Sequence, residues 1–144
     1  MSNDAKELLG RTPLIARRGP FALGAWSVAQ ASAVASGMLR SRGVVWWLVV
    51  DETEVTALVA ESALDELPPC RQCEKGWSVI TLDLAMDWDV TGVIAAISDA
   101  LARAGIPLGA VAAYSRDHLL VPAMRLDQAL DVLSELCADV TVLD

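Results

Sequence analysis

The order of hydrophobic patterns in residues 77–144 restricts the possible folds of this chain more than any other feature. Stretches rich in β-forming residues predict strands, and apolar residues spaced three or four apart predict helices. Gly105 and Pro122 mark boundaries, since glycine ends helices and proline is disfavoured within a sheet. The predicted elements are a strand at 77–84, a helix at 90–104, strands at 106–113 and 118–121 around a turn at 114–117, a helix at 126–136 and a strand at 140–143.

This succession is β-α-β-β-α-β, which predicts an α+β, ferredoxin-like unit with an antiparallel sheet. Both crossover connections take the same right hand, so the two helices lie on one face of the sheet. The opposite face is then left without a layer of its own. Because large exposed apolar surfaces mark interaction sites, we expect a second domain or subunit to cover it.

The first half of the chain shows a less regular version of the same pattern. Two strands at 14–16 and 21–28, a short helix at 29–39 and a hairpin at 44–50 and 54–60 precede the break at Pro68 and Pro69. No second helix or closing strand is predicted before that break. We therefore expect an abbreviated N-terminal domain at 12–67, a linker at 68–76 and a C-terminal domain at 77–144.

Composition and charge exclude several classes of partner. A hydrophobic fraction of 54% places the chain among globular proteins, and the net charge of −8 argues against nucleic acid or an anionic membrane surface. The first ten residues contain no apolar signal-peptide core, and no apolar run reaches the length of a membrane span. These features predict a cytoplasmic protein.

Six segments of the sequence carry a resemblance to a known family: Asp51 to Val59, Gly76-Trp77-Ser78, Thr91 to Ser98, Leu101 to Ile106, Tyr114 to Val121 and Leu126 to Leu130. They resemble a bacterial family of tandem ACT-domain proteins, related to the ACT domains of CASTOR-type arginine sensors. Ala112-Ala113 departs from the Ser-Thr of relatives, and Trp46-Trp47 is bulkier than the family pattern.

The resemblance implies tandem ACT domains, the first abbreviated, and a regulatory or sensor protein that binds an amino acid between ACT units. We also expect a homodimer, and no catalytic activity. An alternative from a different class is an oligomerisation or protein-interaction module that uses the ACT sheet without any ligand. The missing hydroxyls at Ala112-Ala113 favour this alternative, because they indicate a degenerate pocket.

The candidate ligand-binding residues are Asp89, Val90, Thr91, Gly92, Tyr114 and Asp117. An amino acid needs an anion site beside a cation site. With Asp87 or Asp89 as the helix cap, the N–H groups around Val90 to Gly92 would hold the carboxylate. Asp117 in the hairpin turn would accept the ammonium, as the resemblance also implies, or would only cap its own turn.

No catalytic, cofactor or metal motif is present in the sequence, and we expect none of these functions. Cys70 and Cys73 have the spacing of redox and zinc sites, but they lack the further ligands and the following helix of such sites, so this function is a weaker alternative. His118 without a second histidine is expected to be structural. Of the five tryptophans, only Trp88 is expected to line a pocket.

Overall fold

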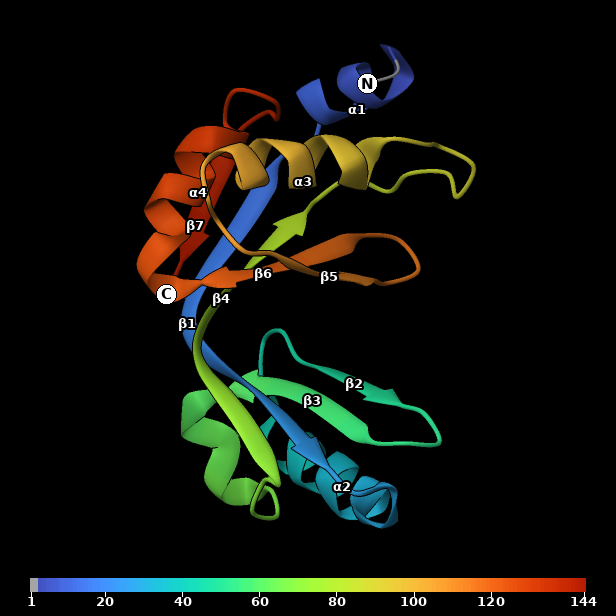
Figure 1. Ribbon diagram of the computed structural model, residues 1–144, viewed down its shortest axis with the longest axis vertical. Helices are drawn as coiled ribbons and strands as arrows, with labels where there is room; N and C mark the ends of the chain where they lie inside the picture. The colour runs from blue at the N-terminus through green and yellow to red at the C-terminus, as the bar shows by residue number, and fades with distance from the viewer. Residues whose placement is uncertain (1–2) are drawn as a thin grey trace. The chain divides into compact units, whose positions relative to one another are not determined.

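The computed structural model describes residues 3–144 and has the predicted α+β architecture (Figure 1). The helices are α1 (Asn3–Gly10), α2 (Ala31–Ser41), α3 (Val93–Arg103) and α4 (Leu126–Leu133). The strands are β1 (Leu14–Trp26), β2 (Trp47–Val50), β3 (Val55–Ala60), β4 (Gln72–Leu82), β5 (Gly109–Ala112), β6 (Asp117–Pro122) and β7 (Val140–Leu143). Short 3-10 helices are η1 (Val28–Gln30), η2 (Glu61–Glu66) and η3 (Ala123–Arg125).

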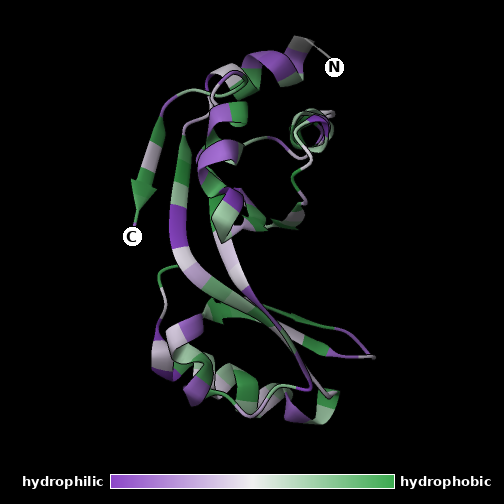
Figure 2. Cartoon of the chain, turned by 60° about the vertical axis from the view of Figure 1, so that its left-hand side comes forward, coloured by the Kyte–Doolittle hydropathy of each residue, from purple (hydrophilic) through white to green (hydrophobic). Residues whose placement is uncertain are grey.

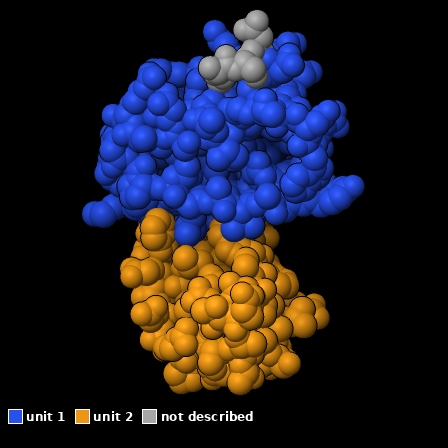
Figure 3. All heavy atoms as spheres, turned by 45° about the vertical axis from the view of Figure 1, so that its right-hand side comes forward, with its two compact units in different colours: residues 1–18, 78–144 blue, residues 19–77 orange. Residues whose placement is uncertain are grey.

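The chain folds into two compact units that do not follow the two consecutive ranges expected from the sequence. Unit 1 consists of residues 1–18 and 78–144, and unit 2 of residues 19–77 (Figure 3). Strands β1 and β4 each contribute residues to both units. Residues 72–76, which were expected to belong to a linker, are the first part of β4.

The sheet of unit 1 contains the predicted β-α-β-β-α-β series from β4 to β7, together with one strand that the sequence did not predict there. Its strand order is β7-β1-β4-β6-β5. The first part of β1 lies between the closing strand and β4, and it pairs with β7 in parallel, Leu14 opposite Val140. The prediction of a purely antiparallel sheet is therefore wrong for this one pair of strands.

The core of unit 1 lies between this sheet and its helices, and alternation along the strands decides which residues enter it. In β1, Leu14 and Ala16 are fully buried, while the intervening residue points away from the core. Each buried leucine contributes about 1.5–3 kcal/mol of hydrophobic stabilisation. The main buried contributors from the other elements are Leu9 of α1, Ile80 and Leu82 of β4, Ile97 and Leu101 of α3, Leu119 and Val121 of β6, and Leu126 and Leu133 of α4.

Unit 2 has the strand order β2-β3-β1-β4 and a small core around Trp26. Its β1 segment belongs to one continuous strand rather than to two strands separated near Arg18 and Pro20, which corrects the sequence prediction. The 3-10 helix η2 occupies the place of a second helix, and β4 supplies the closing strand after the two prolines. The Trp26 indole donates a hydrogen bond of 2.8 Å to the Pro68 carbonyl, which secures that closing segment.

The surface of the chain includes one strand edge with apolar character. β7, which ends at the C label, is coloured largely hydrophobic in Figure 2, and its Val142 and Leu143 side chains are exposed. Among the described residues, no helix combines the length and the apolar content needed to cross a membrane.

Candidate functional site

A pocket of about 330 Å³ lies in unit 1, at the N-terminal end of α3. Its walls come from the end of β4, from the loop that leads to α3, from the first residues of α3, and from the hairpin between β5 and β6. This volume lies near the lower end of the range for small-molecule sites, so it suits a small ligand. Every residue that lines the pocket belongs to unit 1.

Helix α3 begins three residues later than the sequence predicts, and this moves the candidate carboxylate cradle. Gly92 is the cap residue, with a positive φ of 92° that glycine adopts without strain, and no side chain caps the helix. The first-turn N–H groups are therefore those of Val93, Ile94 and Ala95, all of which line the pocket. The prediction that Asp87 or Asp89 caps the helix, with Val90, Thr91 and Gly92 in its first turn, is wrong.

The first intrahelical hydrogen bond of α3 runs from the Ala96 N–H to the Gly92 carbonyl, at 3.0 Å. The N–H groups before it have no carbonyl one turn back, as in any α-helix, and they lie at the positive end of the helix dipole. This geometry favours an anion at the pocket wall formed by residues 93–95.

The β5–β6 hairpin brings acidic, basic and aromatic side chains to the opposite part of the pocket. Asp117 is the first residue of β6, rather than a turn residue as predicted, and it lies opposite Ala112 in the antiparallel register. Tyr114 in the turn approaches Trp88 with 6.4 Å between ring centroids. Both rings line the pocket, so the expectation for Trp88 agrees with its position.

Four of the six predicted ligand-binding residues lie on the pocket wall: Val90, Gly92, Tyr114 and Asp117. Asp89 and Thr91 are exposed and do not line it. The pocket wall also includes Met86 and Arg116, which the sequence did not single out. No local pattern marks them, because one lies on an irregular loop and the other in a hairpin turn.

Arg116 adds a positive charge to a pocket that also contains Asp87 and Asp117. Its guanidinium forms an ion pair of 2.8 Å with Asp83, which follows the last residue of β4. The two side chains are each about 40% exposed, so solvent screens the pair and its contribution to stability is small. In this pair the Arg116 guanidinium points toward Asp83.

His118 lies beside the pocket residues in sequence but belongs to a different cluster. Its Nδ1 atom is 2.8 Å from the Thr81 hydroxyl, which also accepts a hydrogen bond of 3.4 Å from Arg17. Partial burial lowers the pKa of His118, and the positive charges of Arg116 and Arg17 lower it further, against the opposing effect of Asp117. These contacts agree with the structural role predicted for this histidine.

The pocket contains charged, hydroxyl and apolar groups. Among residues 3–144, no group of three or more His, Cys, Asp or Glu side chains is placed to hold a metal ion. The pocket is lined by the first-turn residues of α3, by two carboxylates, one guanidinium and the hydroxyls of Tyr114 and Ser115, and by an apolar wall.

Residues 72–135 match the family model of the ACT domain, so the ACT resemblance expected from the sequence is confirmed over this range. The relation to CASTOR-type arginine sensors remains a prediction. Among curated proteins, none matches the chain.

Solved structures show the same fold over nearly the whole chain. A protein from Agrobacterium tumefaciens is 20% identical, with a TM-score of 0.75 over 93% of this chain and 95% of its own. The regulatory subunit of aspartate kinase from Thermus thermophilus is 15% identical, with a TM-score of 0.61 over 82% and 93%. A possible transport protein of Vibrio cholerae is 21% identical, with a TM-score of 0.68 over 92% and 95%. At these identities the likeness establishes the fold alone.

Proposed function

We propose that the chain is a regulatory protein without catalytic activity, which binds a free amino acid in the unit 1 pocket. The observation that carries this proposal is the presence, in one small pocket, of an anion-favouring helix terminus and of the Asp117 carboxylate. An amino acid presents an anion and a cation close together and matches this arrangement. The cytoplasm remains the proposed location.

In this proposal the ligand carboxylate accepts hydrogen bonds from the N–H groups at residues 93–95, and Asp117 accepts one from the ammonium. Trp88, Tyr114 and Met86 surround the ligand side chain and favour one with apolar surface. Asp89 and Thr91, which lie outside the pocket wall, are proposed only as neighbours of the bound ligand. We also propose that the open side of the pocket is closed by an ACT unit of a second copy in a homodimer.

Calorimetric titration against the twenty common amino acids tests the binding proposal. We expect at least one to bind the unmodified protein, and Asp117→Asn to weaken that binding roughly ten- to hundredfold, since a charge-assisted hydrogen bond contributes about 1.5–3 kcal/mol. Asp131→Asn, a matched change at an exposed position of α4 away from the pocket, should leave affinity unchanged. If no amino acid binds the unmodified protein, the proposal is wrong.

The second candidate function is a ligand-free interaction module, and the edge of unit 2 favours it. β2 is the outer strand in the order of that unit, and its Leu48, Val49 and Val50 side chains are 37%, 50% and 49% exposed. Exposed apolar edge strands promote pairing with another chain. Light scattering separates the two functions: a dimer that forms without any amino acid and dissociates in Val49→Lys supports this module, whereas a dimer that needs an amino acid supports the sensor.

A further inference from the structure

Two of the three cysteines lie close together in unit 2. Cys70 is the residue before a bend at Arg71, and Cys73 is the second residue of β4. Both lie beside Gly24 of β1, because a Cβ atom at that glycine would be 3.0 Å from the Cys70 sulfur, and Cys73 lines a hollow together with the same glycine. The third cysteine, Cys137, is buried in the core of unit 1.

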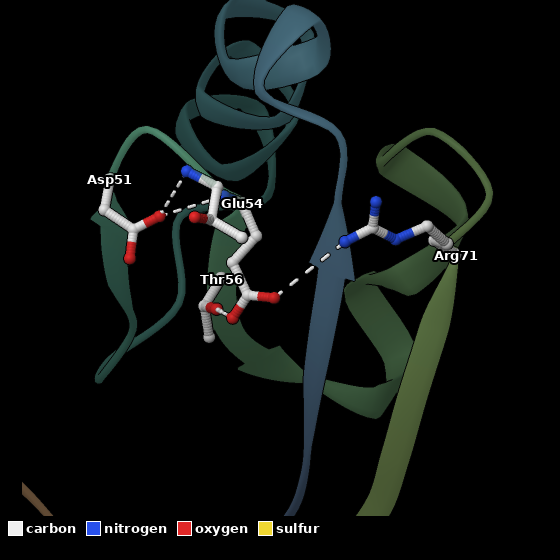
Figure 4. Close-up of polar contacts among 5 residues, drawn as sticks. Asp51, Glu54, Thr56 and Arg71 are labelled. Carbon is white, nitrogen blue, oxygen red and sulfur yellow. Dashed lines mark hydrogen bonds and ion pairs between the residues drawn. The ribbon is translucent and has the colours of Figure 1, made fainter.

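The bend at Arg71, between the two cysteines, is held by contacts on both sides. The Arg71 N–H donates a hydrogen bond of 2.9 Å to the Ala25 carbonyl of β1. Its guanidinium extends toward Glu54, 3.9 Å away, and Glu54 also accepts a hydrogen bond from Thr56 (Figure 4). In a fully extended segment, side chains three residues apart point to opposite faces, so the bend is what makes contact between these thiols possible.

The two thiols differ in their accessibility. Cys73 is exposed and lines a hollow of about 460 Å³ in unit 2, together with Gly24 and Glu54. Cys70 is partly buried against β1, where a Cβ atom on Gly24 would lie 3.0 Å from its sulfur. A small solute therefore reaches Cys73 before Cys70.

The environment of Cys70 agrees with this difference in accessibility. Burial raises the pKa of Cys70, and the neighbouring Cys73 raises it further, against the opposing effects of a local backbone hydrogen bond and of Lys75. A thiolate, rather than a thiol, is the form that attacks an oxidant. Partial burial therefore disfavours Cys70 as the attacking thiol.

We propose that Cys70 and Cys73 form a reversible oxidation site for hydroperoxides, with Cys73 as the attacking thiol and Cys70 as the resolving thiol. Cys73 attacks one oxygen of hydrogen peroxide and becomes a sulfenic acid, with release of one water. The Cys70 sulfur then attacks the Cys73 sulfur, and the Cys70 proton leaves with the hydroxyl group as a second water. The two thiols lose two electrons in total, and the peroxide gains them.

Thiol titration of the full chain before and after treatment with dilute hydrogen peroxide tests this proposal. We expect the number of thiols, counted after denaturation, to fall from three to one, because Cys137 is buried in the core of unit 1 and stays reduced. Mass spectrometry should show one chain that has lost two hydrogen atoms, and a peptide that links Cys70 with Cys73. Dithiothreitol should restore all three thiols.

Single variants distinguish the two roles. In Cys70→Ser, the sulfenic acid at Cys73 cannot be resolved, so dimedone should label Cys73. In Cys73→Ser, Cys70 should stay reduced at the peroxide concentration that oxidises the unmodified chain. Cys137→Ser should behave like the unmodified chain, and circular dichroism establishes that each variant is folded.

Three results would overturn the proposal. They are equal oxidation of Cys70 in the presence and absence of Cys73, disulfide bonds formed only between chains, and retention of all three thiols at peroxide concentrations that oxidise free glutathione.

Discussion

At the scale of single residues, Gly92 determines where the pocket begins. Its φ of 92° turns the chain directly before α3, whose first residues, 93–95, line the pocket. Residues other than glycine rarely adopt this conformation, because their Cβ atom then comes too close to the backbone. The backbone conformation of Gly92 therefore decides which N–H groups belong to the first turn of α3, where we propose that the ligand carboxylate binds.

We predict that Gly92→Ala lowers the free energy of unfolding by about 1–2 kcal/mol, the cost of a positive φ for a residue with a Cβ atom. Amino-acid binding should weaken at the same time, because α3 would begin differently. Urea denaturation and calorimetry measure the two effects. Gly10→Ala is the control, since a Cβ atom there meets nothing within 4 Å; equal stability of the two variants would contradict the prediction.

His118 predicts a pH dependence of stability. Its pKa in the folded state lies below the ordinary value of 6.5, since burial and the charges of Arg116 and Arg17 disfavour protonation and only Asp117 favours it. The unfolded state therefore binds more protons as the pH falls below 6.5. The stability contributed by neutral His118 is fully present above that pH and is lost on acidification toward the lowered pKa of the folded state.

We expect His118→Asn, which retains a hydrogen-bonding partner for Thr81, to reduce the slope of unfolding free energy against pH just below 6.5. Urea denaturation at a series of pH values measures that slope, and the unmodified chain serves as the reference. An unchanged slope in His118→Asn would show that other groups are responsible.

At the scale of elements, unit 2 depends on a close approach between α2 and η2. A Cβ atom on Gly37 of α2 would overlap the carbonyl oxygen of Glu66. The guanidinium of Arg40, one turn later, donates a hydrogen bond of 3.0 Å to the same carbonyl. Glycine at position 37 therefore allows η2 to pack directly against α2.

Gly37→Ala should destabilise the protein by about 1–3 kcal/mol, because overpacking outweighs the helix propensity gained by alanine. Thermal unfolding followed by circular dichroism measures this change. Ser36→Ala, at the neighbouring exposed position of the same helix, controls for propensity. A stabilised Gly37→Ala would mean that η2 moves away without cost.

The elements also show what could be predicted from the sequence. The series from β4 to β7 was correct because strand and helix periodicities are local properties. The pairing of β1 with β7 was missed, since a contact between residues 14–17 and 140–143 leaves no local signal. Arg18-Gly19-Pro20 resembles a turn in sequence, yet β1 continues through it.

The candidate site was also predicted only in part from the sequence. The hairpin turn, Asp117 and the glycine before α3 were found from sequence patterns, and they do line the pocket. The start of α3 was misplaced because the aspartates that precede it are good caps by type, whereas the backbone conformation of Gly92 decides the boundary. Arg116 was missed because only the three-dimensional structure places it beside Asp83.

At the scale of the whole molecule, the discontinuity of unit 1 predicts that residues 77–144 do not fold alone. That fragment lacks Leu9 and Leu14, which are fully buried in the core of unit 1. Their loss removes about 3–6 kcal/mol, a large share of the 5–15 kcal/mol typical of a whole domain. We expect the fragment to lack a cooperative thermal transition and sharp methyl resonances.

A chain in which an Asn-Gly turn joins residues 1–18 directly to residues 78–144 is the matched control. The Ser78 hydroxyl donates a hydrogen bond of 2.7 Å to the Arg18 carbonyl, so these positions are close enough for a tight turn. This joined chain should unfold cooperatively. Cooperative unfolding of the 77–144 fragment would contradict the proposed dependence on residues 1–18.

The parallel pairing of β1 with β7 has a consequence for the time course of folding. Residues 14–17 acquire this neighbour only after residues 140–143 have left the ribosome, whereas residues 19–77 form a contiguous unit that is available much earlier. Contacts between such distant parts of a chain slow the search for the native state. During synthesis, the side of β1 that is buried in unit 1 therefore stays exposed until the rest of that unit has been made, and exposed apolar surface of this kind favours aggregation.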